Sequence, residues 1–159
     1  MEFRFSKYNP KYRDSDNKYN NDEWTCFGDI GKYFKDKAFT MEEYLEIESK
    51  YIYSINSIIS NCQVDRIEIF ECEKYINPNT SVLGDYYLLL NYGNFYDKTQ
   101  VNDLMKLFFR NYAWCVFGVR NVFKIEFGHD LYVHVQIFDL NLNLRKIVED
   151  IQSNEIFLG

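Results

Sequence analysis

A chain of 159 residues with 47% hydrophobic residues is long enough to bury its own core, so one domain is expected, without disulfide or metal staples. Its formal net charge of −6 gives no general attraction to nucleic-acid phosphates, which argues against a nucleic-acid partner and favours a basic protein partner. No stretch approaches the roughly 18 apolar residues of a membrane span, and the first residues carry no signal-peptide run. We therefore expect a cytoplasmic protein with no membrane partner.

Aromatic residues are unusually frequent, with 14 Tyr and 14 Phe. A core of this size cannot hide them all, so some Tyr is expected at the surface, where a rigid ring with a polar tip suits contacts with another protein. A genome rich in AT would favour the same residues, and this alternative stays open.

The first 40 residues predict one strand and a long irregular segment. Phe3 and Phe5 alternate with polar residues, which predicts a strand over 2–8. Residues 9–25 are polar and rich in Asn and Asp, which predicts a loop held down by its aromatic side chains. Residues 27–39 predict a turn or short helix followed by a small hairpin.

A helix is expected over residues 40–60. Thr40 and Glu43 form a capping box, and acidic residues follow in the first turn. The spacing of the apolar residues predicts an inner face made of Met41, Leu45, Ile52, Ile55 and Ile59.

The middle of the chain predicts a strand, two helices and another strand. Residues 65–73 alternate as a strand with Ile67 and Ile69 on one side. Residues 82–92 are ambiguous between strand and helix, and we favour a helix. A further helix, capped by Asp97 or Thr99, ends near residue 110, and residues 112–120 are β-prone. The expected inner faces of the two helices are Val82, Asp85, Tyr86, Leu89 and Leu90 for the first, and Val101, Leu104, Met105 and Phe108 for the second.

Residues 122–138 predict a hairpin, because apolar residues alternate on both sides of Gly128-His129-Asp130. A three-residue loop would pair Phe127 with Leu131 and Ile125 with Val133. Asn143 then caps a last helix with Leu144, Ile147, Val148 and Ile151 inward, and residues 156–158 pack back as an extended tail. The expected fold is a single α+β domain over residues 1–159, a mainly antiparallel sheet with helices packed on one face.

Within the hairpin, Lys124, His129 and His134 could serve as acid, base and phosphate holder in metal-free RNA cleavage. The expected register places His134 opposite Lys124 and Glu126 opposite Tyr132. His129 then lies at the hairpin tip, roughly 13 Å of strand from His134. We favour a turn histidine and a solvated cross-strand pair over a catalytic group.

Metal and cofactor motifs are not expected. Asp14 and Asp16 resemble the start of a calcium loop, but Lys18 and Thr25 stand where further oxygen ligands would be needed. The four Cys, at positions 26, 62, 72 and 115, are widely spaced, which favours reduced thiols over a zinc site. We therefore expect no cofactor, no metal and no enzymatic activity.

The segment from Phe3 to Leu45 carries a recognisable pattern. It reads FRFxKYNP over residues 3–10, YRD over 12–14, DEWT over 22–25, DIGK over 29–32 and EYL over 43–45. With Trp114-Cys115 and the closing Ile-Phe-Leu, it resembles small bacterial immunity proteins of polymorphic or contact-dependent toxin systems. The resemblance implies an immunity protein that binds and neutralises a cognate toxin domain in the cytoplasm, and it carries over no catalytic residue.

An acidic surface with exposed Tyr suits a basic, nuclease-type toxin, because opposed charge speeds association and carboxylates can stand in for substrate phosphates. The predicted contact residues are Tyr12, Asp14, Asp16, Tyr19, Asp22 and Glu23 in the loop, with Glu42 and Glu46 at the helix start as second choice. Trp24, Asp29 and Gly31 are interpreted as structural. Two alternatives stay open: a metal-free nuclease or hydrolase using Lys124, His129 and His134, and a non-catalytic scaffold or oligomerisation module.

Overall fold

The computed structural model describes residues 1–139 and 142–159. Its strands are β1 (Glu2–Ser6), β2 (Tyr33–Phe34), β3 (Lys37–Ala38), β4 (Arg66–Lys74), β5 (Phe95–Asp97), β6 (Ala113–Val119), β7 (Phe123–Phe127), β8 (Val133–Ile137) and β9 (Phe157–Leu158). Its helices are α1 (Met41–Asn61), α2 (Ser81–Leu89), α3 (Val101–Phe109) and α4 (Leu144–Ser153), with short 3-10 turns η1 (Pro10–Tyr12), η2 (Phe27–Asp29) and η3 (His129–Leu131). The predicted α+β fold is confirmed.

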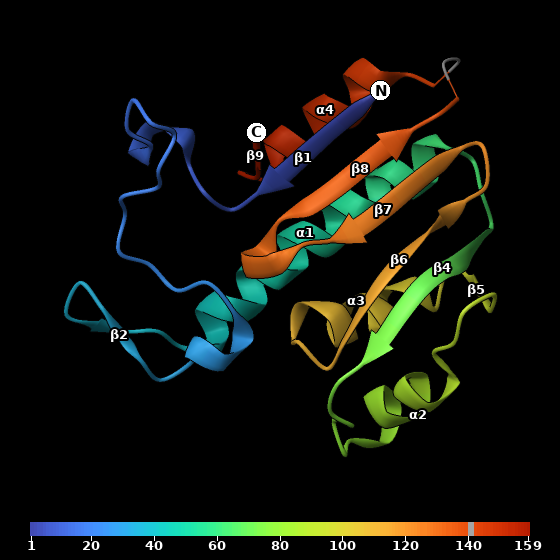
Figure 1. The fold of residues 1–159 in the computed structure, drawn as a ribbon, viewed down its shortest axis with the longest axis horizontal. Helices are drawn as coiled ribbons and strands as arrows, with labels where there is room; N and C mark the ends of the chain where they lie inside the picture. The colour runs from blue at the N-terminus through green and yellow to red at the C-terminus, as the bar shows by residue number, and fades with distance from the viewer. Residues whose placement is uncertain (140–141) are drawn as a thin grey trace.

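One antiparallel sheet organises the described chain in the order β5-β4-β6-β7-β8-β1-β9, while β2 and β3 form a separate hairpin. Figure 1 shows α1, α3 and α4 behind this sheet, so its front face is left open. The inner face of the sheet and the helices share one core, in which Phe5, Ile125 and Val135 have no exposed surface. No helix in the described ranges is both long enough and apolar enough to cross a bilayer.

The central hairpin forms as predicted, but its register was wrong by two residues. Phe127 pairs with Val133 instead of Leu131, and Ile125 pairs with Val135 instead of Val133. The connection is longer because Leu131 has a left-handed backbone (φ 60°) and belongs to η3, where its carbonyl accepts a 2.6 Å hydrogen bond from the Tyr51 hydroxyl. A shift of two keeps every apolar side chain on the core face, because side chains alternate with a period of two.

Helix α1 begins with the predicted capping box between Thr40 and Glu43. Its predicted inner face was partly wrong, because Met41 and Leu45 are 45% and 40% exposed. Tyr44 and Tyr51 occupy the core positions instead, and both are at most 1% exposed. The helix face is therefore rotated toward its aromatic residues, whose larger rings fill the space under the sheet.

The remaining elements follow the predictions with small differences. The small hairpin, the strand at β4, helix α2, helix α3, the strand at β6, helix α4 and the extended tail at β9 are present. Strand β5 was not predicted, and the N-cap of α3 is Gln100 instead of Asp97 or Thr99. The predicted inner face of α2 was partly wrong, since Val82, Asp85 and Leu89 are exposed.

Asp29 closes the turn η2, in line with its structural interpretation. Its carboxylate accepts hydrogen bonds from the Thr25 and Cys26 backbone N–H groups and from Lys32 Nζ at 2.7 Å. Burial by itself would raise the pKa of Asp29, but these hydrogen bonds outweigh it and lower the pKa to about 2.

Candidate functional site

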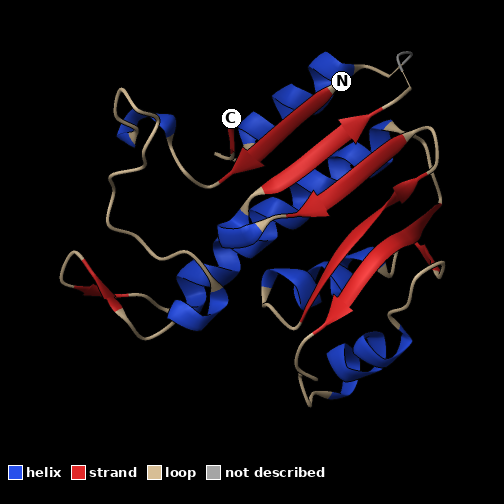
Figure 2. Cartoon of the chain, in the orientation of Figure 1, coloured by secondary structure: helices blue, strands red, loops and turns tan. Residues whose placement is uncertain are grey.

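The predicted contact loop lies in a segment of mostly irregular backbone between β1 and α1. Figure 2 shows this segment beside the sheet, and Figure 1 places it on the opposite side of the view from α2. The segment holds together through its own polar groups. Asp14 accepts hydrogen bonds from Asp16 N at 3.0 Å, Lys18 N at 2.9 Å and Asn20 Nδ2 at 2.9 Å. The bond from Asn20 contributes most to lowering the Asp14 pKa, and these contacts give Asp14 a role in shaping the turn.

Glu23 is the counterion of a buried lysine. Lys7 Nζ lies 2.5 Å from Glu23 Oε2, its side chain is only 3% exposed, and it sits 4.3 Å from the Trp24 ring centroid. Tyr19 and Asn21 also donate hydrogen bonds to Glu23. Burial opposes ionisation of Glu23, but the bonds from Lys7 and Tyr19 outweigh it and lower its pKa. All of these contacts are internal to this segment of the chain, so they stabilise the loop.

The other predicted contact residues are more accessible. Tyr12, Asp16 and Asp22 are exposed in the loop, and Glu42 and Glu46 are exposed at the start of α1, where Glu46 pairs with Lys50 at 2.9 Å. However, residues 1–40 carry eight Lys and Arg against seven Asp and Glu, whereas residues 41–159 carry ten against 17. The acidic excess therefore lies outside the loop.

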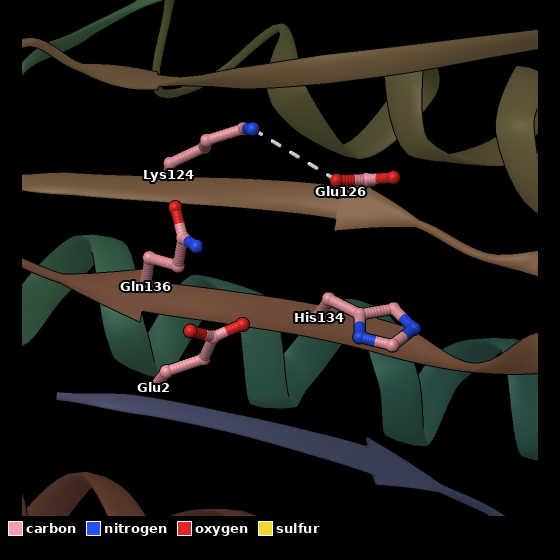
Figure 3. A pocket seen from close by; sticks show the side chains of 5 residues that line it. All are labelled: Glu2, Lys124, Glu126, His134 and Gln136. Carbon is pink, nitrogen blue, oxygen red and sulfur yellow. Dashed lines mark ion pairs between the residues drawn. The ribbon is translucent and has the colours of Figure 1, made fainter.

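The polar residues of the central hairpin gather on the open face of the sheet. A hollow of about 100 Å³ lies there, lined by Glu2, Lys124, Glu126, His134 and Gln136. Figure 3 shows these five side chains on the neighbouring strands. His134 pairs across the strands with Glu126, and Lys124 pairs with Gln136, so the predicted Lys124–His134 and Glu126–Tyr132 pairs were wrong. The Lys124 ammonium points toward Glu126 Oε2, 3.9 Å away.

This cluster does not bring the proposed catalytic set together. His129 is exposed in η3 at the hairpin tip and does not line the hollow. The hollow is also smaller than the roughly 300–1,000 Å³ typical of small-molecule sites. The arrangement matches a ladder of solvated cross-strand polar pairs.

The largest concentration of exposed apolar side chains lies around α2 and β5. Among the described residues, 14 large hydrophobic side chains are exposed, and seven of them fall between residues 75 and 95. These seven, which we call the α2–β5 surface, are Tyr75, Ile76, Val82, Leu88, Leu89, Tyr92 and Phe95. These seven side chains fall within 21 residues of the sequence, and exposed apolar surface is often found at interaction sites of soluble proteins.

Helix α2 exposes apolar residues because it is apolar on several sides. Leu83 and Leu90 are buried and anchor it in the core, while Leu88 and Leu89 are 64% and 57% exposed. The carbonyl of Leu89 accepts a 2.7 Å hydrogen bond from the Tyr96 hydroxyl, which fixes the end of the helix against β5. The exposed leucines are thus held on a rigid support.

A shallow hollow of about 640 Å³ adjoins this surface on the open face of the sheet. It is lined by Arg66, Glu68, Phe95, Gly118, Val119 and Arg120. Arg120 donates two hydrogen bonds to Glu68, at 2.9 and 2.6 Å. Glu68, and to a lesser extent Tyr92, raises the pKa of Arg120, so the Tyr92 hydroxyl lies close to this ion pair. Phe95 is 62% exposed and forms an apolar wall.

Acidic side chains accompany the apolar ones. Glu71 and Glu73 on β4 and Asp85 on α2 are exposed. An apolar surface with carboxylates beside it fits a partner that presents apolar and basic groups. The sequence signal for it was the apolar run at residues 82–92, which fits neither a clean strand nor a clean amphipathic helix.

Comparisons of the chain with models of protein families, with curated proteins and with solved structures gave no match. The resemblance carried by residues 3–45 therefore stays a prediction.

Proposed function

We propose that this chain is an immunity protein that binds a cognate toxin domain in the cytoplasm and neutralises it by protein–protein interaction, without catalysing a reaction. The observation that carries the proposal is the α2–β5 surface, which holds half of the exposed large hydrophobic side chains described. Tyr92 and Phe95 are rigid aromatic side chains of the kind that dominate binding energy at interfaces.

The partner we propose is a basic, nuclease-type toxin domain. A nuclease needs Lys and Arg to hold nucleic-acid phosphates, and the acidic excess of residues 41–159 complements such a surface. Glu71 and Glu73 are placed to meet basic groups while the neighbouring apolar side chains provide buried contact area. The sequence resemblance supports the choice of a toxin over other basic proteins.

We place the main contact at the α2–β5 surface and a secondary contact at the loop. Asp14 and Glu23 are engaged within the loop, so Asp16, Asp22 and Tyr12 remain the side chains there with most freedom to meet a partner. The near-neutral charge of residues 1–40 gives this region less long-range attraction for a basic protein.

The direct test is to ask whether a toxic domain is encoded beside this chain's gene and copurifies with the chain, followed by affinity measurements on variants. Tyr92→Ser and Phe95→Ser should each weaken binding by at least tenfold, since truncated interface anchors typically cost about 2 kcal/mol or more. Tyr33→Ser is the matched control, because Tyr33 is 73% exposed on the distant β2–β3 hairpin. It should leave the affinity unchanged.

Charge reversal separates the two surfaces. Glu71→Lys with Glu73→Lys should slow association and flatten its salt dependence, while Asp16→Lys with Asp22→Lys should have a smaller effect. A larger effect of the loop variants would move the interface to the N-terminal segment. Absence of any complex with the neighbouring toxic domain would refute the immunity function, and stable self-association alone would favour the scaffold alternative.

A further inference from the structure

Two of the four cysteines face each other across adjacent antiparallel strands. Cys72 on β4 is paired in register with Cys115 on β6. Cys115 has no exposed surface, and Cys72 is half-buried and packs against the same core. Both side chains therefore lie on the helix-covered side of the sheet.

The backbone pattern brings this pair closer than the hydrogen-bonded pairs on either side of it. Tyr75 N donates to Tyr112 O at 3.0 Å, which marks a hydrogen-bonded pair three positions from Cys72 and Cys115. Because hydrogen-bonded and non-hydrogen-bonded pairs alternate, the cysteines occupy a non-hydrogen-bonded pair, whose Cα atoms lie about 4.5 Å apart. Disulfides span Cα separations of about 4.4–6.8 Å, so the backbone needs no rearrangement to accommodate one.

We propose that Cys72 and Cys115 form a reversible intramolecular disulfide when the protein meets a small oxidant such as glutathione disulfide. In the first step the Cys72 thiolate attacks one sulfur of glutathione disulfide and releases one glutathione thiolate. The Cys115 sulfur then attacks the Cys72 sulfur and releases the second glutathione. Overall, two protein thiols are oxidised to one disulfide and glutathione disulfide is reduced to two glutathione molecules, which carry away the two protons.

The order of the steps follows from exposure. Cys72 is accessible in part, whereas burial raises the pKa of the Cys115 thiol well above its ordinary value. Directly opposed side chains have Cβ atoms about 4.5–5.5 Å apart, with non-hydrogen-bonded pairs at the short end, which meets the upper end of the roughly 3.5–4.5 Å found in disulfides. Because Cys72 is accessible in part, a thiol can reach the bond, which should be readily reduced as exposed disulfides are.

The bond would tie together the ends of the segment that contains α2, β5 and α3. The α2–β5 surface lies within this closed segment, so oxidation restricts the part of the chain that we propose meets the partner. The disulfide itself does not depend on that function, because it rests on the strand register alone.

The test uses the full chain with Cys26→Ser and Cys62→Ser, which leaves only the proposed pair. The folded protein is incubated with glutathione disulfide, alkylated with iodoacetamide and digested with trypsin. Cleavage after Arg66, Lys74, Arg110 and Arg120 places Cys72 in peptide 67–74 and Cys115 in peptide 111–120. We expect these two peptides joined by a disulfide, an intact mass lower by two hydrogen atoms, and full recovery of both thiols with dithiothreitol.

Two controls make the outcome decisive. The wild-type chain should give the same linked peptides, and Cys72→Ser should leave Cys115 as a free thiol that is alkylated only after denaturation. A stable glutathione adduct on Cys72 with Cys115 still reduced would overturn the proposal. So would linked peptides that form only in denaturant, because the folded register would then play no part.

Discussion

Glu48 and Arg110 form a buried ion pair whose two members should respond very differently to substitution. Arg110, at the C-cap of α3, donates two hydrogen bonds to Glu48 on α1, at 2.8 and 2.7 Å. The Glu48 side chain is 4% exposed and the Arg110 side chain is 20% exposed. Removal of the arginine leaves a carboxylate with no route to water, whereas removal of the glutamate leaves a long side chain that can reach solvent.

The magnitudes follow from this asymmetry. Arg110→Met should lower the free energy of unfolding by about 3–5 kcal/mol, the usual cost of an unpaired buried charge. Glu48→Leu should cost only about 1–2 kcal/mol, since the freed guanidinium can turn outward. The double variant replaces the whole pair by apolar groups and should lie within about 1 kcal/mol of the wild type.

Urea unfolding followed by the fluorescence of Trp24 and Trp114 measures these differences. The double-mutant cycle should give a coupling energy on the order of 4 kcal/mol between Glu48 and Arg110. Arg110→Lys keeps the charge but loses the bidentate hydrogen bonding, so its free energy of unfolding should fall between those of the wild type and Arg110→Met. If Glu48→Leu proves as costly as Arg110→Met, or if the double variant is no better than Arg110→Met, then stranded charge is not the cause.

Three other perturbations test the packing described above. The Tyr51 hydroxyl accepts a hydrogen bond from one buried backbone N–H and donates one to a carbonyl, each at 2.6 Å. Tyr51→Phe should therefore lower the free energy of unfolding in urea by about 1–3 kcal/mol. Tyr53→Phe, at an exposed position, is the control and should not change it measurably. Gly118→Ala would place a Cβ 2.1 Å from a backbone carbonyl oxygen of β7, so it should raise the fraction of unfolded protein in thermal melts. Gly84→Ala inside α2 meets no such obstacle and should stabilise the protein by up to about 1 kcal/mol. The pKa of Asp29 is lowered from 3.8 to about 2 in the folded protein, so its carboxylate stabilises the protein above pH 3.8 and loses this effect as the pH falls toward 2. The loss of unfolding free energy caused by Asp29→Asn should therefore shrink over that pH range. A penalty that stays constant with pH would show that the carboxylate charge is not involved.

The sequence pattern predicted which side chains of the central hairpin face the core, but not which residues pair across its two strands. Alternation placed Phe123, Ile125 and Val135 on the buried face, and all three are fully buried. The register depends on where the turn ends, and the observed connection includes a hydrogen bond from Tyr51 to Leu131, between residues 80 positions apart. Local pattern carries no information about such a contact, so an error of an even number of residues goes undetected.

The same limit explains why the roles of Glu48 and Glu23 were not predicted. Glu48 interrupts the apolar stripe of α1, and its reason is Arg110, 62 positions later. Glu23 was grouped with the exposed acids of its loop, yet it neutralises Lys7. Composition predicted that acids would be available to a partner, but only the folded chain separates those that are engaged internally from those that are free.

The α2–β5 surface was not predicted, because the apolar residues of its helix follow neither a clear strand periodicity nor a clear amphipathic-helix periodicity. A helix that is apolar on several sides usually has more than one of them covered, and this chain buries α2 through Leu83 and Leu90, with Tyr86 and Tyr87 partly buried against the same core. Leu88 and Leu89 contribute little to the folding of the isolated domain, since more than half of each side chain remains in water. A partner that covers these two leucines, together with Tyr92 and Phe95, would complete the burial that the chain begins. That is why we place the main contact here and only a secondary one at the loop, where Asp14 and Glu23 are engaged in internal hydrogen bonds and an ion pair.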